Sequence, residues 1–153
     1  MNAEAKLSEL NLELPPAAEP KGVYRPIVVV GNMAYTSGHL PIAADGTLTT
    51  GRLGDTLDQQ AGYAAARQVG LCILATLRKE LGSLDRVRRL VKLFAVVSCT
   101  HEFTAQPAVV NGCSELLAEV FGPEAGIGAR SAIGTNSLPL GVPVEIEAIF
   151  EIE

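Results

Sequence analysis

The chain closes on a segment in which apolar and mostly acidic residues alternate. Between Val144 and Ile152 every even-numbered position is apolar, whereas three of the odd-numbered positions are glutamates. Successive side chains of a β-strand point to opposite faces of its sheet. The alternation therefore predicts a strand from about Val142 to Ile152.

Two long segments with apolar stripes at helical spacing precede this strand. One helix is predicted from about Asp58 to Leu81, with Gly82 placed to end it, and a second from about Pro107 to Phe121. The other predicted strands are Ile27–Val30, Met33–Ser37, Val87–Val97 and Ala129–Thr135. This order predicts an α+β fold, a single domain with a mixed β-sheet and two helices packed on one face.

The first residues differ from the rest of the chain. Leu7, Leu10 and Leu14 recur at helical spacing, which predicts a short amphipathic helix that Pro15 and Pro16 end. We therefore divide the chain into an N-terminal extension (residues 1–20), with this helix and a linker, and a domain over residues 21–153. Charged residues interrupt the N-terminus, whereas a signal peptide needs a continuous apolar stretch.

The composition argues against two classes of partner. The formal net charge is −5 and aromatic residues are only 5%, whereas nucleic-acid binders cluster Lys and Arg and often stack bases on aromatic rings. The longest charge-free stretch, residues 26–44, contains prolines and glycines and will not span a bilayer as a helix. We expect a cytoplasmic protein that binds neither nucleic acid nor membrane.

Hydrophobic residues are 48% and charged residues 19%, an apolar excess that predicts contacts between subunits.

Few residues are candidates for catalysis. Common nucleotide-binding, nucleophile and metal-binding motifs are absent, and His39 and His101 are each expected to be surface or packing residues. The three cysteines are widely spaced without a Cys-x-x-Cys pair, so neither a disulfide framework nor a zinc site is expected.

The remaining candidates are Arg130 and Glu145. Arg130 opens one predicted strand and Glu145 lies in the next, with the intervening turn at about Asn136–Gly141. If these strands pair as an antiparallel hairpin, the two side chains lie at the same height. Two interpretations stay open: a cross-strand ion pair, or an anion-binding arginine beside a carboxylate that positions water.

Three stretches of the chain resemble the Rid family of reactive intermediate deaminases, also labelled YjgF-like or endoribonuclease L-PSP-like. The resemblance covers roughly residues 21–150, and its combined motifs are specific. They are Gly22-Val-Tyr24 with Gly31-Asn-Met-Ala-Tyr-Thr-Ser-Gly-His-Leu-Pro41, then Val109-Val-Asn111, and finally Ala129-Arg-Ser131 with Leu138-Pro139 and Val144-Glu-Ile-Glu-Ala-Ile149.

The resemblance implies a chorismate-mutase-like fold and a homotrimer with active sites in clefts between subunits. It implies hydrolysis of 2-imino acids to 2-keto acids and ammonia, with a small carboxylate-bearing metabolite as substrate and without a metal or organic cofactor. Arg130 matches the family's carboxylate-binding arginine, and Glu145 matches its water-orienting glutamate. Tyr24 and Ser37 match residues that line the pocket, the first as a wall and the second as a hydrogen-bonding group.

The chain departs from the family pattern beside Arg130. Many members have a cysteine two residues after the arginine, where this chain has Ala132, which still offers main-chain atoms. Many members also have Phe-Pro before Ala-Arg, where this chain has Ile127-Gly128, and the glycines are expected to loosen the approach to Arg130.

Simpler roles also remain open for the pocket residues. Tyr24 could pack against a neighbouring subunit, Ser37 could be a strand-end hydroxyl, and Asn111 is expected to satisfy backbone groups near a helix start. Beside the deaminase stand a trimeric binder of small carboxylates without turnover and, less favoured, a ribonuclease. The acidic charge and the lack of a histidine pair for general acid–base cleavage argue against the ribonuclease.

Overall fold

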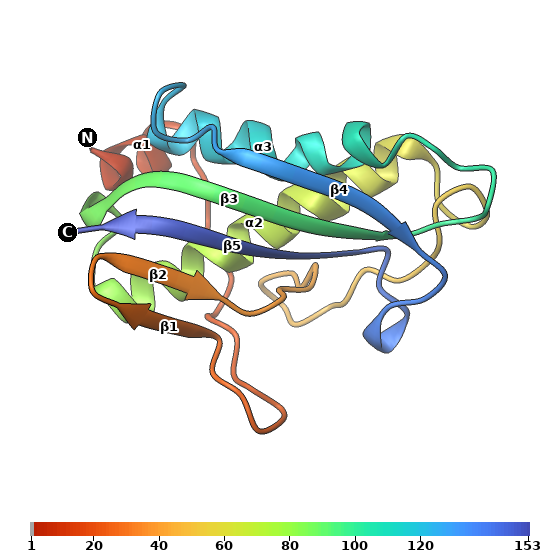
Figure 1. The fold of residues 1–153 in the computed structure, drawn as a ribbon, viewed down its shortest axis with the longest axis horizontal. Coiled ribbons are helices and arrows are strands. Elements are labelled where there is room, and N and C mark those ends of the chain that lie inside the picture. The colour runs from red at the N-terminus through yellow and green to blue at the C-terminus, as the bar shows by residue number, and fades with distance from the viewer. Residues whose placement is uncertain (1) are drawn as a thin grey trace.

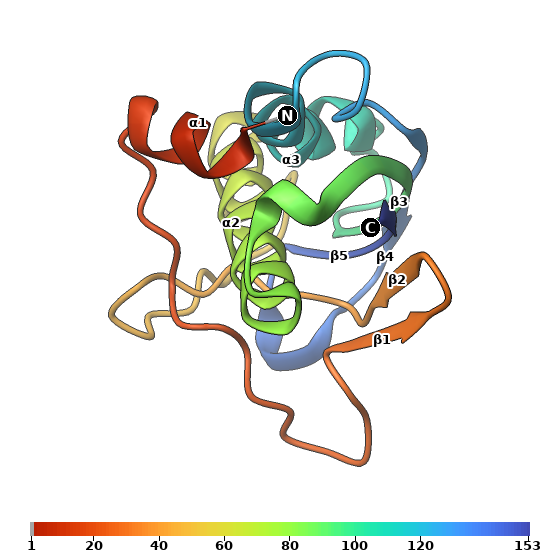
Figure 2. The same ribbon diagram turned by 90° about the vertical axis from the view of Figure 1, so that its left-hand side faces the viewer.

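The computed structural model describes residues 2–153 as a five-stranded sheet with helices on one face (Figure 1). The strands are β1 (Ile27–Val30), β2 (Met33–Thr36), β3 (Val87–Ser98), β4 (Ala129–Thr135) and β5 (Val144–Ile152), in the spatial order β1-β2-β5-β3-β4. Helices α2 (Gln59–Leu81) and α3 (Gln106–Phe121) pack beside each other and cover the same face (Figure 2). The predicted α+β fold with two helices on one face of a mixed sheet is confirmed.

The pairing of the last two strands differs from the expected hairpin. β4 and β5 do not pair with each other; both flank β3, β4 in parallel and β5 antiparallel. The connection between them includes a short 3-10 turn, η2 (Pro139–Gly141), and the chain then passes the end of β3, where Ser98 N–H donates to the carbonyl of Pro143 (2.9 Å). The expectation was wrong because alternation within a strand says nothing about which strand lies beside it.

The ends of α2 follow from local chemistry. The side chain of Asp58 caps the first turn by accepting from the N–H of Ala61 (2.8 Å). Gly82 ends the helix in the left-handed conformation (φ 80°), and its N–H donates to the carbonyl of Arg78 (2.8 Å). The sequence prediction for this helix is confirmed at both ends.

A glycine sets the close approach of α3 to α2. A Cβ added at Gly112 would lie 2.0 Å from the carbonyl oxygen of Tyr63 on α2, a distance that no side chain tolerates. Gly112 therefore lets the backbones meet and fixes how α3 lies on the sheet. The same helix carries Asn111, the residue before Gly112, which belongs to the site described below.

The N-terminal helix is shorter than predicted. α1 spans Ala3–Glu9, and Asn11 adopts a positive φ of 52°, which ends helical geometry before Leu14. The helix is nevertheless well anchored: Leu7 is buried, and the carboxylate of Glu4 pairs with Arg78 and accepts from the N–H of Leu84 at the start of η1 (Leu84–Arg86). The apolar spacing identified the helix, but Asn11 decided its length.

The sheet face opposite the helices is partly apolar. Ile27 and Ala34 are buried beneath the helices, so their neighbours Val28 and Tyr35, which pair with each other across the β1–β2 ladder, point to the open face. Val28 is 44% exposed, Tyr35 42% and Ile133, on β4, 47%. Within residues 2–153, no helix has both the length and the apolar character that crossing a membrane requires.

Candidate active site

Arg130 lies near the start of the edge strand β4, on the helix side of the sheet. Its register partner on β3 is the buried Leu93, and paired residues of parallel strands point to the same face. The guanidinium reaches α3, where Nη1 donates to Asn111 Oδ1 (2.7 Å) and to Ser114 Oγ (3.1 Å). In the described part of the chain, no carboxylate lies within ion-pairing distance of Arg130. The half-buried cation is therefore held by two neutral groups and forms no ion pair.

The contacts of Asn111 and Ser114 differ from what the sequence predicted. Asn111 was expected to satisfy backbone groups near a helix start, but it lies within α3 and accepts from Arg130. Ser114 was not identified at all. The signal that could have found them is their spacing, because polar residues three apart share one face of a helix that is otherwise mostly apolar.

A cavity of about 260 Å³ lies beside the guanidinium, between α3 and the loop that leads into β4. Arg130, Asn111 and Ser114 line one part of it, and Ile127 and Gly128 line another. The carboxylate of Glu115 also lines the cavity, where it accepts from the hydroxyl of Tyr63 rather than pairing with Arg130. A Cβ at Gly128 would lie 2.8 Å from the carbonyl oxygen of Leu90. The glycine allows the loop to press against β3, so here it provides close packing rather than the loosened approach that was expected.

Ala132 lies two residues further along β4, on the same side as Arg130. It pairs with the buried Ala95 of β3 and packs, half-buried, against the core. Its side chain carries no functional group, so only its main chain can contact a ligand.

Glu145 lies on the other face of the sheet, next to Ser37. It pairs with Val96 of β3, whose neighbours Ala95 and Val97 are buried beneath the helices, so Glu145 points to the open face. Its carboxylate rests on Gly38, where a Cβ would lie 2.1 Å from Oε1. Burial, and secondarily the charge of Glu147, raise the pKa of Glu145 above its usual 4.5. A carboxylate with a raised pKa is better suited to exchanging protons near neutral pH.

His39 is buried between this part of the sheet and α2. The ring is 3% exposed, with Nδ1 2.8 Å from the Ser37 carbonyl oxygen and Nε2 2.8 Å from Thr76 Oγ1 on α2. Because a carbonyl can only accept, Nδ1 carries the hydrogen and Nε2 accepts from the threonine hydroxyl. The His39 backbone also exchanges hydrogen bonds with Ile146 (2.8 and 3.2 Å), so one residue fixes both Ser37 and the strand that carries Glu145.

Burial lowers the pKa of His39 below its usual 6.5, which gives a testable pH dependence. Because the folded-state pKa lies below the unfolded one, the unfolded chain binds the proton more tightly. The stability that neutral His39 contributes is thus complete above pH 6.5 and is lost as the pH falls toward the folded-state pKa. In thermal unfolding at a series of pH values, we expect the wild-type Tm to fall more steeply below pH 6.5 than that of His39→Gln. The control is His101→Gln, at an exposed position, whose Tm should depend on pH as that of the wild type does. Parallel curves of Tm against pH for the wild type and His39→Gln would contradict the role of buried His39.

Tyr24 lies in the loop before β1 and is 52% exposed. No hydrogen bond joins its hydroxyl to Ser37, Arg130 or Glu145 in the described residues.

The fold therefore separates the predicted site residues into two groups. Glu145 lies on the open face against Gly38, the residue after Ser37, whereas Arg130 and Ala132 lie on the helix side of β4. Since β3 separates β4 from β5, Arg130 and Glu145 of one chain do not meet across a hairpin. The simple cross-strand ion pair considered from the sequence is excluded.

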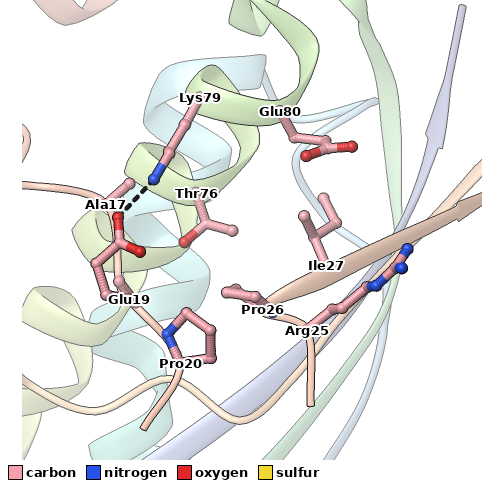
Figure 3. A pocket seen from close by; sticks show the side chains of 10 residues that line it. Ala17, Glu19, Pro20, Arg25, Pro26, Ile27, Thr76, Lys79 and Glu80 are labelled. Atoms are coloured by element: carbon pink, nitrogen blue, oxygen red, sulfur yellow. Dashed lines mark hydrogen bonds and ion pairs between the residues drawn. The ribbon is translucent and has the colours of Figure 1, made fainter. Parts of the chain in front are cut away.

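A separate cavity of about 250 Å³ lies between the N-terminal extension and α2 (Figure 3). Pro20, Pro26 and Ile27 provide apolar walls, and Lys79 at its rim pairs with Glu19 (2.6 Å). None of the predicted site residues lines this cavity, and its lysine already has a carboxylate partner.

Comparisons with known proteins agree with this architecture. A family model described as "YjgF/chorismate_mutase-like, putative endoribonuclease" matches residues 4–148. Protein TCP17 of Trypanosoma cruzi is 42% identical over 97% of this chain and 92% of its own length. Two crystal structures superpose over nearly the whole chain. Atu1372 of Agrobacterium tumefaciens, a protein of unknown function, has a TM-score of 0.89 and 38% identity over 99% of this chain and 94% of its own.

The second structure is a protein from Shewanella oneidensis that carries the same endoribonuclease label. It has a TM-score of 0.93 and 32% identity over 98% of this chain and 99% of its own. Both superpositions include the N-terminal extension, because each covers at least 98% of this chain. The chorismate-mutase-like fold that the family model describes agrees with the fold observed here. The chain belongs to the YjgF/chorismate mutase-like family.

Proposed function

We propose that this protein hydrolyses reactive 2-imino and enamino acids to 2-keto acids and ammonia, in clefts between subunits. The observation that carries the proposal is Arg130, a half-buried guanidinium beside a cavity, held by Asn111 and Ser114 and not ion-paired in the described residues. A cation kept partly from water without an acidic partner favours an anionic ligand. The planar guanidinium can hold a carboxylate through two parallel hydrogen bonds, which fixes the position of the neighbouring imine carbon.

In the proposed reaction, Glu145 acts first as a general base and then as a general acid. A water hydrogen-bonded to its carboxylate attacks the carbon of the protonated imine; the C–O bond forms, and one water proton passes to Glu145. Glu145 then returns this proton to the nitrogen, the C–N bond breaks, and ammonia leaves as the remaining hydroxyl loses its proton to form the keto group. Ammonia takes up the released proton, so the products are a 2-keto acid and ammonium. The raised pKa of Glu145 supports its taking and returning a proton near neutral pH.

The proposed site requires a second copy of the chain, because Arg130 and Glu145 of one chain face opposite sides of the sheet. We propose a homotrimer in which the edge strand β4 of one copy brings Arg130 to Glu145 and Ser37 of the next. The exposed apolar side chains of the open face, including Val28, Tyr35 and Ile133, support burial against another copy.

This assembly predicts a native mass close to three times the 16.0 kDa of one chain. We expect light scattering to give that value at micromolar concentration. Tyr35→Glu is expected to lower it, because a charge on the open face would be buried without a partner. Val23→Glu, in a fully exposed loop position, provides the matched control. A monomer, or a stable dimer, in the wild-type protein would contradict the shared site.

The activity itself is tested by ammonia release from freshly generated 2-imino acids. These compounds hydrolyse spontaneously, so we expect the rate with protein to exceed the rate without it. The alternative is a trimer that binds small carboxylates through Arg130 without turnover. Keto-acid binding together with an unchanged hydrolysis rate would favour that binder.

A further inference from the structure

A second arginine combines partial burial with the lack of a counter-charge. Arg52 lies in the long loop between β2 and α2 and is half-buried. Its Nη2 donates to the carbonyl oxygen of Cys99 (3.0 Å), whereas its Nε is buried without any acceptor. Among residues 2–153, no carboxylate lies within ion-pairing distance of Arg52. The guanidinium is partly removed from water and is met by one neutral carbonyl.

The fold holds Arg52 in place at the end of the sheet. The next residue, Leu53, is fully buried and pairs with the end of β3: its N–H donates to Ser98 O (3.0 Å), and its carbonyl accepts from Thr100 N–H (2.9 Å). The N–H of Arg52 donates to Thr56 Oγ1 (2.9 Å) within the loop. The backbone of Arg52 is therefore fixed on both sides, and the hydrogen bond from Nη2 to Cys99 O directs its guanidinium toward the end of β3.

Arg52 lines a cavity of about 350 Å³ in which it is the only Lys or Arg among the described residues. Thr100, His101, Gln106 and Asn136 contribute polar side chains, and within the described chain no Asp or Glu lines it, although the net charge of the protein is −5. The volume falls in the range of about 300–1,000 Å³ that is typical of small-molecule sites.

The place of this cavity in the sheet adds to the argument. β3 ends at Ser98 and the parallel strand β4 at Thr135, and α3 begins at Gln106, so the cavity lies where two parallel strands end and a helix starts. Ligands of α/β sheets commonly bind beyond the carboxyl ends of parallel strands. The free N–H groups of the first helical turn favour negative charge there, and the residue before α3, Ala105, provides no side-chain cap.

We propose that this cavity is a second anion-binding site, centred on Arg52, for a small oxyanion such as a carboxylate or a phosphate. It lies at the opposite end of β4 from Arg130 and shares no lining residue with the cavity there. The proposal does not depend on the deaminase activity. The cavity beside the N-terminal extension provides a contrast, since the carboxylates of Glu19 and Glu80 line it and Glu19 pairs with Lys79.

The test is a titration followed by backbone amide NMR, with inorganic phosphate and with acetate as separate probes. The titration uses the full-length protein and its Arg130→Ala variant, so that binding at Arg130 is removed from the signal. We expect saturable shifts of the amides of Thr100, His101 and Asn136 in both proteins. The two probes distinguish a phosphate site from a carboxylate site.

Arg52→Gln is expected to weaken this binding about tenfold or more, because it removes charge-assisted hydrogen bonds. Arg25→Gln, which also removes one positive charge but lies at the other cavity, should leave the affinity unchanged. If Arg52→Gln does not fold, Asn136→Ala, at an exposed position, decides: we expect about threefold weaker binding or more.

Three results would overturn the proposal. The first is the absence of saturable shifts in the wild-type protein. The second is unchanged affinity in Arg52→Gln, or in Asn136→Ala where that variant decides. The third is a lower native mass of Arg52→Gln without ligand binding in the wild type, which would mean that Arg52 pairs with an acidic group of another copy.

Discussion

Replacing Arg130 by alanine is expected to abolish binding of small carboxylates to the proposed active site. A hydrogen bond to a charged group contributes about 1.5–3 kcal/mol, so losing two of them costs roughly a hundredfold or more in affinity. Arg130→Lys should rescue little, because lysine keeps the charge but not the planar pair of donors that holds two oxygens. Isothermal titration with a 2-keto acid measures both effects.

The matched control is Arg88→Ala, which removes an exposed arginine on β3 that pairs with Glu153 at 3.5 Å. This variant should bind the keto acid as the wild type does. If Arg130→Ala also binds it normally and only lowers the Tm, then Arg130 serves to hold α3 against β4 through Asn111 and Ser114. That result would remove the observation on which the proposed function rests.

Glu145→Gln is expected to separate catalysis from binding. Glutamine keeps the shape of the side chain but cannot take a proton from water, so turnover should fall about 10²–10⁴-fold if Glu145 acts as a general base. Keto-acid binding should persist, because Arg130 is unchanged. Steady-state kinetics of ammonia release, together with titration of the keto acid, check the two halves of this expectation. If turnover and keto-acid affinity fall by the same factor, Glu145 contributes to ligand binding instead of to catalysis.

Glu147 provides a sharper control on the same face. Its charge contributes to the raised pKa of Glu145, so Glu147→Gln should lower that pKa. Since Glu145 must be ionised to accept a proton, the acid limb of the rate profile should move to lower pH while the plateau rate stays near that of wild type. An unchanged acid limb would mean that another group controls it.

Local patterns determined most of the secondary structure. The alternation from Val144 to Ile152, the apolar stripe of α2 and the glycine at its end, Gly82, each depend on neighbours within a few residues, and the structure confirms them. α1 was identified by the same spacing but ended early, because Asn11 adopted a left-handed conformation that apolar spacing does not encode.

The candidate residues were also found from sequence, but their arrangement was not. Arg130 and Glu145 lie in adjacent predicted strands, and chain order alone suggested a hairpin. In the structure β3 lies between those strands, so the two side chains face opposite sides of the sheet. Contacts between distant segments decide which strands pair. The alternation within a strand fixes only which of its side chains face the helices, and any neighbouring strand can meet that requirement.

The sequence by itself determined that this chain forms a sheet half-covered by two helices, and it identified an arginine and a glutamate near its end as candidates for the chemistry. Periodicity and motif spacing are properties of the chain, so they can be read before it folds. Only the tertiary structure decided what surrounds those residues. Gly112 brings α3 close to α2, and α3 presents Asn111 and Ser114 to Arg130; Gly38 makes room for Glu145. Such contacts join segments far apart in the sequence, and their geometry exists only once the helices and the sheet have packed.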